Sequence, residues 1–254
     1  MTMNYNDVGV IILAAGKCTR MKSDMPKVLH KVAGKSMIMH VIETAKKITP
    51  DNIHVVVGHK SDDVKEEISK YCKVNFAEQK QLIGTGDAVK SATPGMSPSI
   101  KNILVLCGDV PLIQEKTIKN LIDKHKQNYA KVSVLAVDLD DPTGYGRIVL
   151  DDKNSMLCIR EEADTNAVEK KIKTINTGIY CFEKEFLVFA LEEIKPDNNQ
   201  AEYYLTDIVE IAQKKHEKIM VVAMTDYRQV IGVNTIEDLN RVENLIKDME
   251  NQLP

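Results

Sequence analysis

Short apolar runs that alternate with helical patterns constrain the fold of this chain more than any other feature of its sequence. Three runs, GVIIL at 9–13, IHVVV at 53–57 and ILVLC at 103–107, are rich in Val, Ile and Leu, and a glycine follows each of them closely. Runs this short are typical of buried strands rather than buried helices. We therefore expect three central, parallel strands.

Segments with helical periodicity lie between these runs, at 36–48 and 61–71. Ser36 and Ser61 are the expected N-caps, because a serine side chain can accept a hydrogen bond from a free backbone N–H at the start of a helix. Strands and helices that alternate along a chain are typical of α/β proteins with right-handed crossovers.

The second half of the chain has a different pattern. After VSVLAV at 132–137, the strand-like segments YGRIVL, SMLCIR and INTGIYCF follow, with no full helix between the first two. Helical patterns return at 183–194, 201–214 and 235–249, and Thr235 with Asp238 predicts a capping box. We expect a Rossmann-like α/β fold, with a mixed, mostly parallel sheet, an inserted hairpin and flanking helices.

Charge and composition exclude several classes of protein. Of 254 residues, 34 are Lys or Arg and 37 are Asp or Glu, so no overall positive field would attract nucleic acid or an anionic membrane. No apolar stretch reaches the ~18 to 20 residues of a membrane-spanning helix, and no basic signal segment opens the chain. The scattered cysteines argue against disulfides and structural zinc. We expect a cytoplasmic protein.

Two familiar glycine motifs are incomplete here. GTGDAV at 84–89 begins like a dinucleotide-binding fingerprint, but it lacks the third glycine and does not follow the first strand. GKS at 34–36 resembles the end of a P-loop whose leading glycine is replaced by Leu29. Neither standard motif is therefore expected to bind a nucleotide in its usual way.

The loop after the first strand, LAAGKCTRMKSDMPKVL, carries candidate phosphate-binding residues. Small residues at Ala14, Ala15 and Gly16 let backbone N–H groups approach an anion. Arg20 and Lys27 add a forked guanidinium and a compact ammonium, which together suit a leaving pyrophosphate. A plain glycine turn with solvated charges is the alternative.

Two residues are candidate metal ligands. Asp109 follows the run at 103–107, at the edge where open α/β sheets bind ligands, and Mg²⁺ needs only one or two protein ligands there. Asn234 offers a neutral carbonyl oxygen as the second ligand. The alternative is that Asp109 caps a helix near Pro111 and that Asn234 only leads into the last helix.

In eight separated motifs the chain resembles the uridylyltransferase domain of bacterial bifunctional N-acetylglucosamine-1-phosphate uridylyltransferases. The motifs are LAAGKCTRM, PKVLH, GTGDAV, CGDVPL, TGYGRIV, INTGIYCF, EYYLTDIV and GVN. The resemblance implies the nucleotide-diphospho-sugar transferase fold. It also implies condensation of UTP with N-acetylglucosamine 1-phosphate to UDP-N-acetylglucosamine and pyrophosphate, with Mg²⁺ as cofactor.

The resemblance also implies roles for individual residues. The nucleotide-binding residues would be Leu13, Ala14, Ala15, Gly16, Gln79, Gly84 and Thr85. The catalytic cations would be Arg20 and Lys27, and the metal ligands would be Asp109 and Asn234. The sugar-phosphate-binding residues would be Gly146, Glu161, Asn176, Tyr204 and Thr206. A general base is not expected, because the sugar phosphate is already an anionic nucleophile.

Four positions depart from the family pattern, one of which is Ala163, where the usual lysine after Glu161 is missing. Cys18 replaces a usual glycine in the phosphate turn, and Cys107 replaces an aromatic residue of some members. Leu82 stands where the glutamine that reads uracil is expected, so Gln79 or Gln81 would take that role. We favour Gln79.

No hexapeptide repeat, the mark of the acetyltransferase β-helix in the bifunctional proteins, occurs in this sequence. We therefore expect one nucleotidyltransferase domain at 1–254, without acetyl-transfer activity. Its nucleotide-binding half would lie at about 1–112 and its sugar-phosphate-binding half at about 113–235, followed by the helix at 235–249. A monomer or weak dimer is expected, and the implied partners are the two small-molecule substrates, with no nucleic acid and no membrane.

Two other functions are compatible with the residues. One is a related nucleotidyltransferase for another sugar phosphate or nucleotide. The other is a catalytically silent nucleotide-binding module, although such a module has no need for a metal pair and leaving-group cations.

Overall fold

The computed structural model describes residues 4–16, 21 and 23–251, and side chains up to residue 248. Nine strands form one sheet in the described part of the chain, with the central order β11-β7-β10-β6-β1-β4-β5. Strand β8 pairs with β10, and β9 pairs with β8. The strands are β1 Val8–Leu13, β4 Ile53–Val57, β5 Asn75–Glu78, β6 Asn102–Cys107, β7 Val132–Asp138, β8 Gly146–Leu150, β9 Met156–Arg160, β10 Thr174–Glu183 and β11 Ile219–Met224. A small hairpin pairs β2 Lys31–Val32 with β3 Lys35–Ser36.

The three predicted central strands are confirmed as β1, β4 and β6. Strand β1 pairs in parallel with both of the others, so that Val10 lies opposite Ile53 on one side and Leu104 on the other. The carboxyl ends of all three strands therefore meet at one edge of the sheet. Parallel strands are typically buried on both faces, which explains why these segments are continuously apolar.

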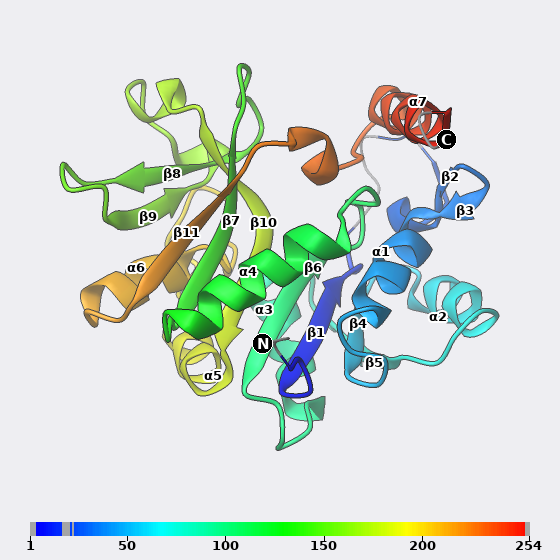
Figure 1. The fold of residues 1–254 in the computed structure, drawn as a ribbon, viewed down its shortest axis with the longest axis horizontal. Helices are drawn as coiled ribbons and strands as arrows, with labels where there is room; N and C mark the ends of the chain where they lie inside the picture. The colour runs from blue at the N-terminus through cyan, green and yellow to red at the C-terminus, as the bar shows by residue number, and fades with distance from the viewer. Residues whose placement is uncertain (1–3, 17–20, 22, 252–254) are drawn as a thin grey trace.

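Strand β10 makes the sheet mixed, as predicted. It runs antiparallel between β6 and β7, and its first residues also pair with β8. The β8–β9 hairpin is the predicted insertion and projects from the upper left of the molecule (Figure 1). The register of β10 slips between Asn176 and Tyr180, so a bulge lies where the strand changes partner from β8 to β6.

Helices cover both faces of the sheet (Figure 1). They are α1 Met37–Lys46, α2 Ser61–Ser69, α3 Thr85–Ala92, α4 Glu115–Gln127, α5 Lys184–Glu193, α6 Asp207–Lys214 and α7 Ile236–Asn251. Val10 and Ile12 face a core with α1, α2 and α4, whereas Ile11 faces the opposite core with α3, α5 and α6. This alternation is the period of a strand. Among the described residues, no helix is long and apolar enough to span a membrane.

The helix termini confirm one prediction and correct others. The Thr235 side chain accepts a hydrogen bond from the Asp238 N–H at 3.1 Å, and Asp238 Oδ2 accepts one from the Thr235 N–H at 2.9 Å, so the capping box is confirmed. Ser36 precedes α1, but its side chain makes no capping bond. The prediction for Ser61 is wrong, because Ser61 is already helical and Lys60 precedes it in the left-handed conformation.

The helix predicted at 201–214 begins only at Asp207. The preceding segment binds the glycine loop near residue 84 instead. Tyr203 N–H donates to the Ile83 carbonyl at 2.7 Å, and the Tyr203 carbonyl accepts from Gly86 N–H at 2.8 Å. These backbone groups are committed to a distant loop, so they cannot form helical hydrogen bonds.

Candidate active site

A cavity of about 450 Å³ lies at the carboxyl ends of β1 and β6, and we call it the β1 cavity. It gathers nine of the predicted site residues: Leu13, Ala14, Ala15, Gly16, Lys27, Gln79, Gly84, Thr85 and Asp109. Its wall also includes Val28, Leu82, Ala88, Cys107 and Glu202. Arg20 and Cys18 lie outside the residues that the structure describes.

Gly84 lines the β1 cavity and lies against the backbone of Tyr203. Its φ of +123° lies in the range that side chains disfavour, and a Cβ there would lie 2.4 Å from the Tyr203 carbonyl oxygen. Leu205 N–H also donates to the Thr85 hydroxyl at 3.1 Å. The glycine loop is therefore attached to the 203–205 segment, which leads directly to the predicted sugar-side residue Thr206.

Gln79 is buried in the wall of the β1 cavity, and its amide nitrogen is hydrogen-bonded within the protein. Its Nε2 donates to the Gly84 carbonyl and to Asp87 Oδ2, both at 2.9 Å. Gln81, the alternative from the sequence, is exposed and is not among the residues that line the cavity. The geometry thus favours Gln79 as the residue that meets a ligand.

Lys27 lies between the two candidate metal ligands. Its ammonium is 2.5 Å from Asp109 Oδ2 and 3.1 Å from Asn234 Oδ1. Both the lysine and the aspartate side chains are about one-fifth exposed, at 20% and 19%. One cation of the protein therefore already occupies the space between a carboxylate and an amide oxygen.

The peptide backbone brings Asp109 and Asn234 together across a long stretch of sequence. Val233 N–H donates to the Asp109 carbonyl at 3.0 Å, and Asn234 N–H donates to Asp238 Oδ2 at 3.0 Å. Asp109 is not a helix cap, because α4 begins at Glu115 after Gln114. Asn234 does lead into α7, and its backbone N–H binds Asp238 at the start of that helix, whereas its side-chain oxygen accepts a hydrogen bond from Lys27.

Cys107 lies between the β1 cavity, which it lines, and the bulge of β10, next to the predicted sugar-phosphate-binding residue Asn176. Its thiol donates to the Gly178 carbonyl at 3.4 Å, inside the bulge of β10. Burial, together with the nearby Asp109 carboxylate, raises the pKa of this thiol to about 12, and Lys27 opposes the shift. Cys107 is therefore a neutral hydrogen-bond donor at physiological pH.

Four of the five predicted sugar-phosphate residues lie together beside this bulge. Gly146 pairs with Asn176 between β8 and β10. A Cβ at Gly146 would lie 3.3 Å from Glu161 Oε2, so the missing side chain lets the carboxylate approach. Burial raises the pKa of Glu161, the neighbouring Thr206 hydroxyl works against this rise, and Asp164 and Glu202 add to it.

The Asn176 amide makes one hydrogen bond through its nitrogen and one through its oxygen. Its Nδ2 donates to the Tyr180 hydroxyl at 2.6 Å, and its Oδ1 accepts from Gly178 N–H at 3.1 Å. Gly178 has a φ of +76°, and a Cβ there would lie 2.9 Å from the Cys107 sulfur. Asn176 still pairs with Ala136 and Gly146, and the bulge begins directly after it.

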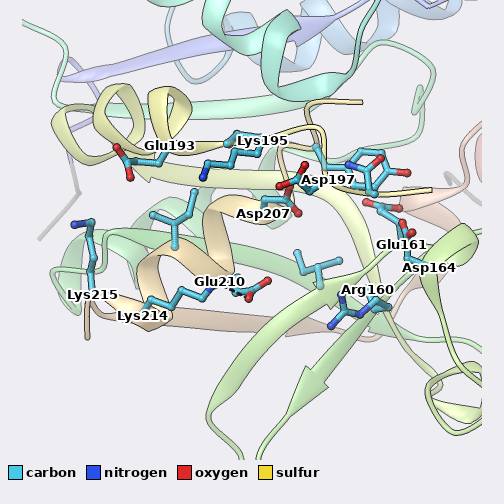
Figure 2. Close-up of a pocket in the computed structure, with 15 residues that line it drawn as sticks. Arg160, Glu161, Asp164, Glu193, Lys195, Asp197, Asp207, Glu210, Lys214 and Lys215 are labelled. Carbon is cyan, nitrogen blue, oxygen red and sulfur yellow. Dashed lines mark ion pairs between the residues drawn. The ribbon is translucent and has the colours of Figure 1, made fainter. Parts of the chain in front are cut away.

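A second cavity, of about 560 Å³, lies between β9, α6 and the segment after α5, and we call it the α6 cavity. Figure 2 shows Glu161 and Asp164 at one end and Lys214 and Lys215 near the other. The fifth predicted sugar-side residue, Tyr204, also lines it, and its hydroxyl donates to Gln200 Oε1 at 2.5 Å. Although larger, the α6 cavity is not lined by the cluster of Lys27, Asp109 and Asn234, which we call the Lys27 group.

The α6 cavity is dominated by carboxylates near α6. Burial raises the pKa of Asp207 to about 6, and Glu210, Glu161 and Asp164 add repulsion while Arg160 opposes it. In the described part of the chain, no group of three or more His, Cys, Asp or Glu side chains could hold a metal ion. Asp109 with Asn234 remains the candidate pair.

Asp87 and Tyr180 contact predicted site residues but were not found from the sequence. Asp87 lies three residues after Gly84, in the first turn of α3, and Tyr180 lies across the bulge from Asn176. Asp87 is part of the GTGDAV motif, but its contact with Gln79 could not be seen in the sequence, because the fold alone brings the two side chains together.

Two solved structures share the fold of this chain. HddC from Yersinia pseudotuberculosis, complexed with GMP-PN, has a TM-score of 0.69 and 21% sequence identity, over 94% of this chain and 99% of that chain. 4-Diphosphocytidyl-2C-methyl-D-erythritol synthase from Anaerococcus prevotii has a TM-score of 0.67 and 17% identity, over 96% and 100%. At these identities the likeness concerns the fold, which is the predicted nucleotide-diphospho-sugar transferase fold.

Curated relatives are closer in sequence. A protein from Clostridioides difficile named bifunctional protein GlmU is 43% identical over 250 residues, which are 98% of this chain and 53% of the relative. The protein of the same name from Desulfotalea psychrophila is 38% identical over 245 residues, 96% of this chain and 70% of the relative. The chain spans about half the length of several such relatives.

Residues 9–250 match the family described as nucleotidyl transferase, so the match covers almost the whole chain. It includes both cavities and the Lys27, Asp109 and Asn234 group. Together with the fold and the curated relatives, this match confirms the resemblance of the eight motifs. The chain belongs to the nucleotidyl transferase family and is an enzyme of that kind.

Proposed function

We propose that this chain condenses UTP with N-acetylglucosamine 1-phosphate to form UDP-N-acetylglucosamine and pyrophosphate. The observation that carries the proposal is that Asp109, the partner of Lys27, lies two residues after Cys107 in the chain. The Cys107 thiol donates to the Gly178 carbonyl, and the Gly178 N–H donates to Asn176. A nucleotide at one end and a sugar phosphate at the other would meet beside Asp109. The name of the bifunctional relatives supports this reaction, since they match nearly the whole chain.

A divalent metal is general for this family, and we propose Mg²⁺. The donor set fits it, because a carboxylate and an amide oxygen are hard ligands and substrate phosphates can supply others. The structure offers a further test of fit, since a protein cation already lies between these two oxygens. Asp109 and Asn234 would hold the ion, and bound Mg²⁺ would neutralise phosphate charge.

The protein groups of the β1 cavity would position and neutralise the triphosphate. Small residues at 14–16 allow backbone N–H groups to approach phosphate oxygens. Lys27 would leave the space between Asp109 and Asn234 and stabilise charge on the leaving pyrophosphate, together with Arg20. The attacking phosphate oxygen is already anionic, so the reaction requires in-line alignment rather than a base.

On the other side of Cys107, Asn176 and Glu161 would recognise the sugar. One N–H and one oxygen lone pair of the Asn176 amide remain beyond its two internal bonds. Such a pair suits an acetamido group, which has one acceptor and one donor. Gly146 and Thr206 would form the edge of this sugar-binding site, and Tyr204 would lie behind Glu161.

The organisation of the chain is proposed in the same terms. Residues at about 1–112 would bind the nucleotide, those at about 113–235 the sugar phosphate, and the helix at 235–249 would close a single domain. The proposed partners are the two small-molecule substrates. A monomer or weak dimer and a cytoplasmic location stay predictions.

Pyrophosphate release by the purified chain tests the proposal. UTP with N-acetylglucosamine 1-phosphate is compared, with and without Mg²⁺, to glucose 1-phosphate and to the other nucleoside triphosphates. We expect metal-dependent release only with the first pair. Release with another pair would keep the reaction class and overturn the substrate, and no release with any pair would overturn the activity.

A further inference from the structure

The orientation of the Gln79 amide is determined by its surroundings. Both groups that contact Nε2, the Gly84 carbonyl and the Asp87 carboxylate, can only accept hydrogen bonds. A flipped amide would place its oxygen against two other oxygens. Gln79 therefore uses both of its amide hydrogens inside the protein.

Only an acceptor then remains on this side chain for a ligand. In the part of the chain that the structure describes, no donor contacts Gln79 Oε1, and Gln79 lines the β1 cavity beside Gly84 and Thr85. Uracil presents a donor at N3, whereas cytosine presents an acceptor at the same position. An amide that offers only an oxygen is thus complementary to uracil and repels cytosine.

We propose that Asp87 is a positioning residue that sets this base preference by holding the second amide hydrogen of Gln79. The inference rests on the proposed function, because it concerns the choice among pyrimidine nucleotides in the β1 cavity. The Gly84 carbonyl by itself holds one hydrogen and leaves the amide able to rotate. The Asp87 carboxylate supplies a second, charged acceptor, and such hydrogen bonds are the stronger ones.

Asp87 is itself well anchored. It lies in the first turn of α3, where a carboxylate is favourable near the helix N-terminus. Ala88 N–H donates to the Gly84 carbonyl at 3.2 Å, so the helix and both acceptors move as one unit. The orientation of the Gln79 amide is thereby coupled to the start of α3.

Equilibrium binding of UTP, CTP and dTTP to the full chain, with Mg²⁺ and without sugar phosphate, tests the inference. For Asp87→Ala we expect the preference for UTP over CTP to fall about tenfold, which corresponds to about 1.4 kcal/mol. The preference for UTP over dTTP should not change, because thymine has the same N3–H. Asp87→Asn should keep most of the preference, since its amide oxygen still accepts.

Asp63→Ala is the matched control, because Asp63 also lies in the first turn of a helix, α2, and is exposed away from the cavity. It should leave all three affinities as in the wild type. Equal losses of UTP and CTP affinity in Asp87→Ala, or an unchanged ratio, would overturn the inference. A wild type without preference for UTP over CTP would instead overturn the proposed nucleotide, and the two failures are distinct.

Discussion

Two amides in this molecule, Gln79 in the β1 cavity and Asn176 in the bulge of β10, have contrasting environments. Gln79 donates both of its amide hydrogens to protein acceptors, so it offers a ligand only an oxygen. Asn176 donates one hydrogen to Tyr180 and accepts one bond from Gly178, so it offers one donor and one acceptor. The same functional group therefore presents different hydrogen-bonding groups to its surroundings, according to which internal partners it has.

The charges around the two amides differ as well. Lys27 lines the β1 cavity, whereas Glu161, Asp164 and Asp207 line the α6 cavity. A phosphate chain needs cations, and neutral hydroxyl and acetamido groups need hydrogen-bond partners. This difference predicts that substitutions in the first region lower turnover and those in the second lower sugar affinity.

Asp109→Asn should have the largest effect, because it removes the charge from the proposed metal ligand and from the partner of Lys27. We expect turnover to fall about 10²- to 10³-fold, the range seen when a preorganised charge is lost. Steady-state pyrophosphate release measures this, with circular dichroism to show an intact fold. Turnover like that of the wild type would remove Asp109 from the metal site.

Lys27→Met should lower turnover about 10²-fold while the KM for the sugar phosphate stays within about twofold, because the ammonium acts on developing charge. The variant should also bind Mn²⁺ more tightly without nucleotide, since Lys27 no longer competes for Asp109 and Asn234. Electron paramagnetic resonance of Mn²⁺ measures the latter. Lys35→Met, which removes an exposed partner of Glu43, is the control. Unchanged metal affinity would argue against this competition.

Asn176→Ala should raise the KM for N-acetylglucosamine 1-phosphate about tenfold and leave the KM for UTP unchanged. The loss of one or two hydrogen bonds to a ligand is of this size. Steady-state kinetics with each substrate varied in turn measures both constants. Equal losses for the two substrates would contradict a sugar-side role.

Tyr180→Phe should act in the same direction but more weakly, about three- to fivefold, because it removes only the hydroxyl that holds the Asn176 amide. The ring should still stack on Phe182, 5.4 Å away between centroids. In an Asn176→Ala background the substitution should have no further effect, since the two residues act through one bond. Tyr5→Phe, which removes a hydroxyl that donates to Asp123 and lines neither cavity, controls for hydroxyl loss. Additive effects would separate Tyr180 from Asn176.

The pH dependence of stability should reflect the carboxylates of the α6 cavity. The pKa of Asp207 rises from 3.8 to about 6, so the folded state holds this proton more tightly than the unfolded chain. Stability therefore falls as pH rises through this range. Because the side chain is partly exposed, we expect about 1 kcal/mol from this group.

Asp207→Asn should remove this part of the pH dependence. Urea unfolding at about pH 4 and about pH 6.5 measures it. The exposed Asp51→Asn serves as the control and should lose stability with rising pH as the wild type does. Parallel curves for wild type and Asp207→Asn would show that Asp207 does not titrate in this range.

Local features of the fold could be predicted because they depend on neighbouring residues. The strands at 9–13, 53–57 and 103–107 are apolar on both sides, and the capping box of α7 joins residues only three apart. Predictions failed where distant groups competed. The 201–206 segment has a helical pattern, but its backbone binds the glycine loop at 83–86.

The α/β alternation, the mixed sheet with its hairpin, and most residues that line the β1 cavity could be predicted from local patterns in the sequence. How those residues are oriented depends on the fold. It brought Asp87 to Gln79, Tyr180 to Asn176, and Lys27 between Asp109 and Asn234. The physical reason is that hydrophobic periodicity is a local property of a chain, whereas the direction of a hydrogen bond depends on whichever acceptor the fold places within about 3 Å.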